Sequence, residues 1–267
     1  MLCFSSRLNN PTYKPAADRL LAALDLFNIK YKLLNKTKDI WLRDFMPVRT
    51  RSGKYVSFRY EPSYLKDNPD LKTDFKADVL SQLALPDLTF SDINLDGGNV
   101  VFSPSKEKVI ISDRVFSENP DRNETDLTSE LENLLEARVI IIPSLKSDMT
   151  GHADGMVRFL DEKTVLVNRP LSPHGFETKV KKALCSSGFA VLDFPFVLSG
   201  NDSAVGCYLN FLLTNEAVFL PVFRIPEDKS ALKEAQGIFG LPSVAVPVRE
   251  LAEAGGCLNC ISWEYPN

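Results

Sequence analysis

A repeated unit of β-hairpin, helix and apolar strand is the feature that most restricts how this chain can fold. The unit recurs about four times, at intervals of roughly 50 to 60 residues. Residues 54–60 alternate between apolar and polar side chains after a Ser-Gly turn, and residues 139–142 form a wholly apolar run typical of a strand buried on both faces. Recurrence at this spacing indicates a solenoid, a propeller or a related closed array. No linker divides the repeats, so we expect a single α/β domain over residues 1–267.

Helices are predicted where apolar side chains recur three and four positions apart. This spacing predicts helices over residues 15–27, 73–83, 176–185 and 228–239, and a further helix that begins at Asp126 or Thr128.

The composition excludes several classes of protein. The formal net charge is −4, so nucleic acid is not expected as a partner. No apolar run approaches the ~18 residues that a membrane span needs, and residues 1–7 lack the pattern of a secretory signal peptide. The five cysteines are odd in number and scattered, which favours reduced thiols and a cytoplasmic location.

Four short stretches carry polar side chains beside glycine or at a strand edge. They are Trp41-Leu42-Arg43-Asp44, Leu95-Asp96-Gly97-Gly98-Asn99, Gly151-His152-Ala153-Asp154 and the run from Gly255 to Cys260. A closed array brings such edges together at its axis. There they would supply three carboxylates, one histidine and one cysteine.

The pair His152 and Asp154 illustrates how much depends on this convergence. On a strand, residues two apart face the same side, so the two side chains would share one site. Alone, the pair is better explained by a strand end whose polar residues meet water. The other three stretches favour the interpretation as a site.

Three clustered carboxylates repel one another unless a cation neutralises them. A guanidinium suits such a pocket because it is planar, permanently charged and rich in N–H donors. Its central carbon is open to attack by a thiolate, the strongest nucleophile among these side chains. A histidine can then protonate the departing nitrogen and later deprotonate water.

These stretches, with Tyr-Leu-Asn-Phe at residues 208–211 and a terminal Gly-Gly-x-x-x-Cys-Ile-Ser, resemble the motifs of the agmatine deiminase and bacterial-type peptidylarginine deiminase family, in the same order. The match extends from about residue 39 to residue 263. The resemblance implies a pentein fold of guanidine-modifying enzymes, an α/β propeller of pseudo-repeated ββαβ modules around a central active site. We expect its N-terminal module to be truncated.

The resemblance also implies roles for individual residues. Cys260 corresponds to the nucleophile and His152 to the general acid/base. Asp44 and Asp154 correspond to the carboxylates that hold the guanidinium, and we expect Trp41 to line the same pocket. Asp96 stands where the family usually has the glutamate that supports the histidine, and it is one methylene shorter.

The function implied is hydrolysis of a guanidino C–N bond through a thiouronium intermediate on the cysteine, with release of ammonia. Agmatine, which would give N-carbamoylputrescine for polyamine biosynthesis, is the leading substrate. Peptidyl-arginine or another small guanidine is the alternative, followed by amidino transfer to an amine. A non-catalytic binding protein is disfavoured because Asp44, His152, Asp154 and Cys260 are all present.

No metal or organic cofactor is expected, and the partners implied are a small cationic guanidino substrate and a second copy of the chain in a homodimer. Cys257 and Cys260 form a Cys-x-x-Cys pair that could instead be redox-active or half of a zinc site, but zinc requires two more ligands. We expect Arg43 to be a structural ion-pair partner.

Overall fold

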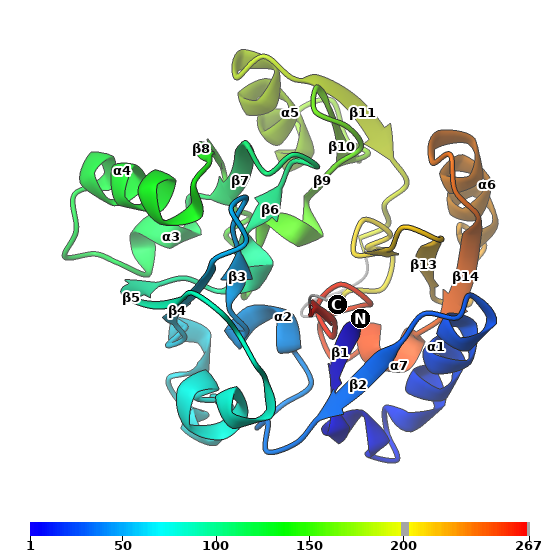
Figure 1. Ribbon diagram of the computed structural model, residues 1–267. Coiled ribbons are helices and arrows are strands. Elements are labelled where there is room, and N and C mark those ends of the chain that lie inside the picture. The colour runs from blue at the N-terminus through cyan, green and yellow to red at the C-terminus, as the bar shows by residue number, and fades with distance from the viewer. Residues whose placement is uncertain (199–202, 266–267) are drawn as a thin grey trace.

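Five small sheets surround a common centre, with the longer helices on the outside (Figure 1). The structure is a computed structural model that describes residues 1–198 and 203–265. In these ranges every sheet has three strands. The strands are β1 (Leu2–Ser5), β2 (Tyr31–Leu34) and β15 (Trp263–Glu264); β3 (Val48–Arg49), β4 (Tyr55–Arg59) and β5 (Leu88–Asn94); β6 (Val101–Phe102), β7 (Lys108–Ser112) and β8 (Arg138–Ile142); β9 (Val157–Phe159), β10 (Thr164–Asn168) and β11 (Ala190–Phe194); β12 (Leu212–Leu213), β13 (Val218–Val222) and β14 (Ser243–Pro247).

Each sheet repeats one pattern: its central strand is antiparallel to one neighbour and parallel to the other. A parallel connection needs a crossover segment, and helices provide four of them. The helices are α1 (Lys14–Leu26), α2 (Leu42–Phe45), α3 (Arg114–Ser117), α4 (Glu124–Leu135), α5 (Phe176–Ser186), α6 (Asp228–Ile238) and α7 (Arg249–Ala252). Between β4 and β5 the crossover is a series of short helical segments, so the helix predicted over residues 73–83 is present as a π-helix (Phe75–Val79) followed by a 3₁₀ helix (Leu80–Gln82) rather than as an α-helix.

The prediction of about four repeats was one short, because the fifth sheet joins the two ends of the described chain. β1 pairs in parallel with β2 and antiparallel with β15, with Cys3 opposite Trp263. The N-terminal amino group also donates to the carbonyl oxygen of Tyr265 at 3.1 Å. A unit assembled from segments some 260 positions apart leaves no repeat signal in a linear pass along the sequence.

Local chemistry explains the helix boundaries. α4 begins after Asn123, whose side chain accepts hydrogen bonds from the backbone N–H groups of Thr125 and Asp126. The predicted start at Asp126 or Thr128 was therefore too late. Leu127, Leu131 and Leu135 are buried on one face, as the i, i+4 spacing requires.

Apolar cores fill the spaces between sheets and helices, whereas polar turns occupy the inner strand ends. α2 packs against the 3₁₀ turn Gly97–Asn99, which in turn packs against the 3₁₀ turn Ala153–Gly155. None of the helices in the described ranges is long and apolar enough to cross a membrane.

Candidate active site

The polar turns singled out in the sequence converge on one cavity of about 780 Å³. The residues in its lining include Trp41, Asp44, His152, Asp154 and Cys260. The backbone N–H of Arg43 donates to the carbonyl oxygen of Cys260 at 3.0 Å, which joins the first and last turns directly. Asp96 is not part of the lining, and it contacts the cavity through His152 and Tyr64.

His152 and Asp154 share this cavity, but not because they lie on a strand. His152 is extended, with φ −69° and ψ 141°, and the chain then enters the turn Ala153–Gly155. The strand begins only at Val157. Gly151, with φ +61°, takes the left-handed conformation that admits this entry. The predicted convergence is confirmed, whereas the predicted strand is wrong.

His152 lies between two carboxylates. Its Nε2 is 2.9 Å from Oδ2 of Asp96, and its Nδ1 is 3.6 Å from Oδ1 of Asp44. The shorter side chain of Asp96 therefore reaches the imidazole. Tyr64 donates its O–H to the same Asp96 oxygen at 2.8 Å, and its ring meets the His152 ring edge-on at 6.3 Å. Tyr64 thus fixes the carboxylate that holds the histidine.

Neighbouring charges oppose the effect of burial on the pKa of His152 and, apart from that of His152, add to its effect on the pKa of Asp44. Burial lowers the pKa of His152, but Asp44, Asp96 and Asp154 outweigh it and raise the pKa to about 10. Burial raises the pKa of Asp44 well above its usual range, and the other carboxylates add to this shift while His152 opposes it. Oδ1 of Asp44 is buried and accepts no hydrogen bond from the described residues. The cluster is thus built to receive a cationic donor.

Two asparagines position Asp154 and Cys260. Oδ2 of Asp154 accepts from Asn210 Nδ2 at 3.2 Å and from Asn259 Nδ2 at 2.6 Å. Oδ1 of Asn210 also accepts from the backbone N–H groups of Asn259 and Cys260, at 3.1 and 3.3 Å. One side chain therefore holds both the carboxylate and the turn that carries the thiol.

The Cys260 thiol lies beside Asp154, with Sγ 3.8 Å from its Oδ2. Burial raises the pKa of Cys260 well above 9, and the negative charges of Asp154 and Asp44 raise it further. A cation bound between these carboxylates would reverse that contribution, because it stabilises a neighbouring thiolate. The geometry therefore couples thiol activation to occupancy of the cavity by a cation.

Glycines permit the close approach of these groups. A Cβ at Gly98 would lie 2.6 Å from Oδ1 of Asp44 and 2.6 Å from Nδ1 of His152. A Cβ at Gly256 would lie 2.5 Å from the ring of Trp41. Trp41 is half-buried and lines the cavity, as expected.

Three polar residues of the site were not predicted, namely Asp39, Tyr64 and Asn259, and Asn210 was noted only as part of the motif at residues 208–211, without a role. Asp39 lines the cavity and accepts from the Trp41 N–H at 3.1 Å, and burial raises its pKa to about 7. Its position two residues before Trp41 was the available signal. Tyr64 comes from the turns between β4 and β5, where nothing in the sequence ties it to Asp96.

Arg43 was expected to be a structural ion-pair partner, and this prediction is wrong, because Arg43 makes no ion pair in the described ranges. Its guanidinium instead donates to the Asn259 carbonyl at 3.3 Å and to Ser262 Oγ at 3.5 Å. Cys257 is fully buried, and its thiol approaches the carbonyl of Ala204. Within the described residues, no group of three or more potential ligands is placed to hold a metal ion.

A protein-family model described as Porphyromonas-type peptidyl-arginine deiminase matches residues 8–266. A Lactococcus lactis protein with the curated name "Putative agmatine deiminase" is 25% identical over 182 residues, which are 55% of this chain and 50% of that protein. The aligned part of this chain thus spans half the length of that curated relative.

Solved structures extend the likeness to nearly the whole chain. Campylobacter jejuni agmatine deiminase superposes with a TM-score of 0.72 at 19% identity, covering 98% of this chain and 92% of that one. Agmatine deiminase of Enterococcus faecalis gives 0.75 at 16% identity, with 98% and 92% covered. At these identities the likeness establishes a shared α/β fold.

Proposed function

The chain belongs to the Porphyromonas-type peptidyl-arginine deiminase family, and from this membership we propose that it hydrolyses a guanidino C–N bond, releasing ammonia and a ureido product. The observation that carries the proposal is the single cavity in which the Cys260 thiol and the His152 imidazole meet the Asp44 and Asp154 carboxylates. We further propose that residues 1–267 form one pentein domain, a propeller of ββαβ modules. Five like sheets around one centre support this arrangement (Figure 1).

Substrate binding is the first step of the proposed mechanism. Asp44 and Asp154 accept hydrogen bonds from the N–H groups of the guanidinium, and Oδ1 of Asp44, which accepts none from the described residues, is available for this. The bound positive charge lowers the pKa of the Cys260 thiol, which the same carboxylates otherwise raise. The nucleophile therefore forms only when substrate is present.

The thiolate then attacks the central carbon of the guanidinium and forms a C–S bond. Nε2 of His152 is engaged by Asp96, so Nδ1 is the nitrogen left to serve the substrate. The imidazolium gives a proton to one terminal nitrogen, the C–N bond breaks, and ammonia leaves. The enzyme is left with a cationic thiouronium on Cys260 and a neutral imidazole.

Water completes the cycle. Neutral His152 takes one proton as water adds to the thiouronium carbon. The C–S bond then breaks to restore the thiolate and yield the ureido product. The second proton passes to solvent, where it forms ammonium with the ammonia released earlier, so each turnover consumes one water and returns His152 as imidazolium and Cys260 as thiolate. Asp96, Tyr64, Asn210 and Asn259 act by positioning the reacting groups.

An ammonia-release assay over agmatine, free arginine and an arginine peptide tests this function. We expect ammonia and ureido product in a one-to-one ratio from agmatine. Amidino transfer would instead require an amine acceptor and yield an amidinated amine without a ureido product. Saturable binding of all three compounds without ammonia would contradict hydrolysis and favour a binding protein.

The position of Asp39 favours a substrate whose tail is cationic. Its carboxyl shares the cavity with the proposed guanidinium site, where it could pair with the terminal ammonium of agmatine. Arg7 lines the same cavity and supports free arginine as the second candidate, because its guanidinium could pair with an α-carboxylate. Agmatine remains the first choice, since Arg7 is exposed and already donates to the Thr37 carbonyl at 2.6 Å.

The Asp39→Asn variant should lose a pH dependence of substrate binding. Because the pKa of Asp39 is raised to about 7, its carboxyl becomes charged as pH rises through 7. We therefore expect KM for agmatine to fall between pH 6 and pH 8 by about tenfold, the effect of one added ion pair. Asparagine keeps an acceptor for the Trp41 N–H but cannot ionise, so its KM should be flat.

Steady-state kinetics across this range measure the effect, with Asp67→Asn as the matched control because Asp67 is exposed and outside the cavity. An unchanged pH slope of KM in Asp39→Asn would show that Asp39 does not bind the tail.

A further inference from the structure

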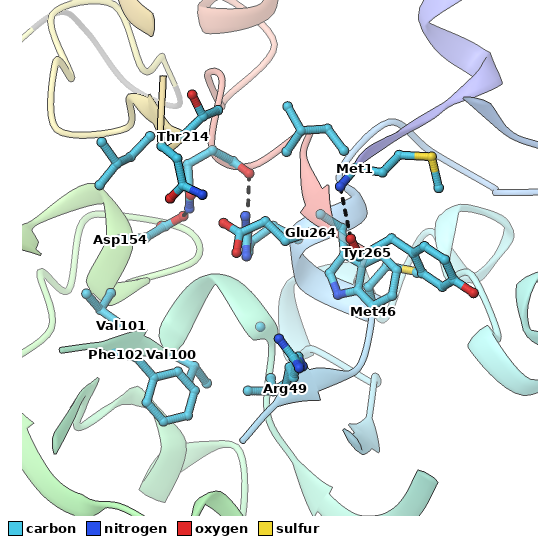
Figure 2. A pocket seen from close by; sticks show the side chains of 18 of the residues that line it. Met1, Met46, Arg49, Val100, Val101, Phe102, Asp154, Thr214, Glu264 and Tyr265 are labelled. Carbon is cyan, nitrogen blue, oxygen red and sulfur yellow. Dashed lines mark hydrogen bonds between the residues drawn. The ribbon is translucent and has the colours of Figure 1, made fainter. Parts of the chain in front are cut away.

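A second cavity, of about 1260 Å³, opens onto the centre of the molecule (Figure 2). Arg49 from β3 and Glu264 from β15 line it, and Asp154 lies in the wall of both cavities. We propose that this second cavity binds a small anion carrying carboxylate or phosphate groups. The proposal goes beyond the deiminase function and does not depend on it.

The charge of the lining is the first argument. Its cationic side chains are Lys30, Arg43, Arg49, Lys106 and Arg158, whereas its carboxylates are Asp154, Glu216 and Glu264. The chain as a whole carries a net charge of −4, so this surplus of cations is local. Asp154 is already committed to two asparagine amides. An anion entering from solvent therefore meets a net positive chamber.

Four of these cations form no close ion pair with a described residue, although Asp154 and Glu264 act on Arg158, and Glu264 on Lys106, from farther away. Within the described residues, no carboxylate lies within 4.0 Å of the charged nitrogens of Arg43, Arg49, Lys106 or Arg158. The charges also disfavour one another. Burial lowers the pKa of Lys106, Glu264 opposes the shift, and Arg49 and Arg43 add to it. A bound anion would offset both the burial and the repulsion.

Arg158 gives the chamber a fixed anchor. Its guanidinium lies over the ring of Phe211, 4.5 Å from the centroid, and donates no hydrogen bond to another described residue. Burial lowers the pKa of Arg158 to about 10, and nearby Arg43 contributes. A guanidinium stacked on an aromatic ring is held in one plane with its donors free, which suits bidentate binding of a carboxylate or phosphate.

Size and adaptability complete the case. The volume suits a metabolite-sized ligand rather than a macromolecule. Lys106 is placed over the ring of Phe102 at 5.2 Å while its Nζ donates to the Arg49 carbonyl at 2.7 Å, so Lys106 and Arg49 occupy adjacent positions. Arg49 and Lys106 can thus approach a ligand that Arg158 orients.

Calorimetric titration of the full chain with citrate and with inorganic phosphate, at constant ionic strength set by chloride, tests the proposal. We expect saturable binding of at least one anion with one site per chain. Arg158→Gln should weaken it at least tenfold, the effect of losing one bidentate charged contact. Arg49 is exposed, so its replacement should leave the fold intact. Arg49→Gln is therefore an independent variant, and it should weaken binding several-fold.

Two control variants show which of the two cavities the anion occupies. Arg51→Gln, exposed and paired with Glu107 outside the lining, should leave the affinity unchanged. Arg7→Gln removes one of the cations of the active-site cavity, which Lys38 also lines. If Arg7→Gln weakens binding while Arg158→Gln and Arg49→Gln do not, the anion occupies the other cavity and the proposal fails. It fails equally if neither anion binds saturably, or if all variants bind alike.

Discussion

Replacing Cys260 with serine is expected to lower turnover by about three orders of magnitude or more while the fold and substrate binding persist. The pKa of the thiol is already held well above 9 by burial and by Asp154 and Asp44. A hydroxyl is far less acidic, so even a bound guanidinium cannot generate the alkoxide at neutral pH. Single-turnover ammonia release and calorimetric substrate binding would separate the two effects.

The fold should survive because the hydrogen bonds of residue 260 to Asn210 and Arg43 are made by its backbone, and a serine hydroxyl can replace the thiol as the donor to Asp154. The N–H of residue 260 donates to Asn210 and its carbonyl accepts from Arg43. Cys185→Ser is the matched control, since Cys185 is exposed, and Cys257→Ser should also remain active. Activity of Cys260→Ser within tenfold of the parent would mean that another group is the nucleophile.

His152→Asn is expected to lower kcat by about 10² to 10⁴-fold, the range typical for loss of a general acid and base. The pKa of His152, raised to about 10, keeps the imidazolium available throughout the neutral range in the free protein. The alkaline decline of kcat/KM in the parent should therefore lie near pH 10 and be absent from the variant. Rates measured from pH 6 to pH 10.5 would test both expectations.

The free energy of unfolding should depend on pH through the same titration of His152. The pKa of His152 is about 10 when folded and about 6.5 when unfolded, so its stabilising contribution is complete below pH 6.5 and is lost as pH rises to 10. His152→Asn should consequently be most destabilised at pH 6 and approach the parent at pH 10 in denaturant unfolding. His174→Asn, in an exposed loop, should match the parent throughout. A pH-independent difference for His152→Asn would contradict the charge assignment.

The repeating architecture could be predicted because hydrophobic periodicity is local. The apolar run of β8 and the leucine spacing of α4 are visible within a few residues. The sheet of β15, β1 and β2 was invisible, since its strands come from opposite ends of the sequence. Between β4 and β5 the helical spacing located a helical segment but could not predict its π and 3₁₀ geometry, because tertiary packing decides that geometry.

The convergence of the side chains proposed to react could be predicted from motifs, but the residues that support them could not. Asp44, His152, Asp154 and Cys260 stand in short stretches whose residue types suit the chemistry. Tyr64 donates to Asp96 from 32 positions earlier in the chain, and Asn210 bridges Asp154 and Cys260 across long sequence separations. Such partners are chosen by three-dimensional proximity, which spacing along one chain does not encode.

The pairing of β1 with β15 has a consequence for the order in which the molecule acquires its reactivity. Cys260 lies three residues before Trp263, which pairs with Cys3, so this pairing adds to the contacts with Asn210 and Arg43 that hold the proposed nucleophile. Contacts of such long sequence separation form late, because the intervening chain must first be organised. In a partly folded molecule, the carboxylates and the imidazole could already lie close together before the turn that carries the Cys260 thiol reaches them. We therefore expect the cysteine to reach its position beside the carboxylates late in folding, after β1 and β15 have paired.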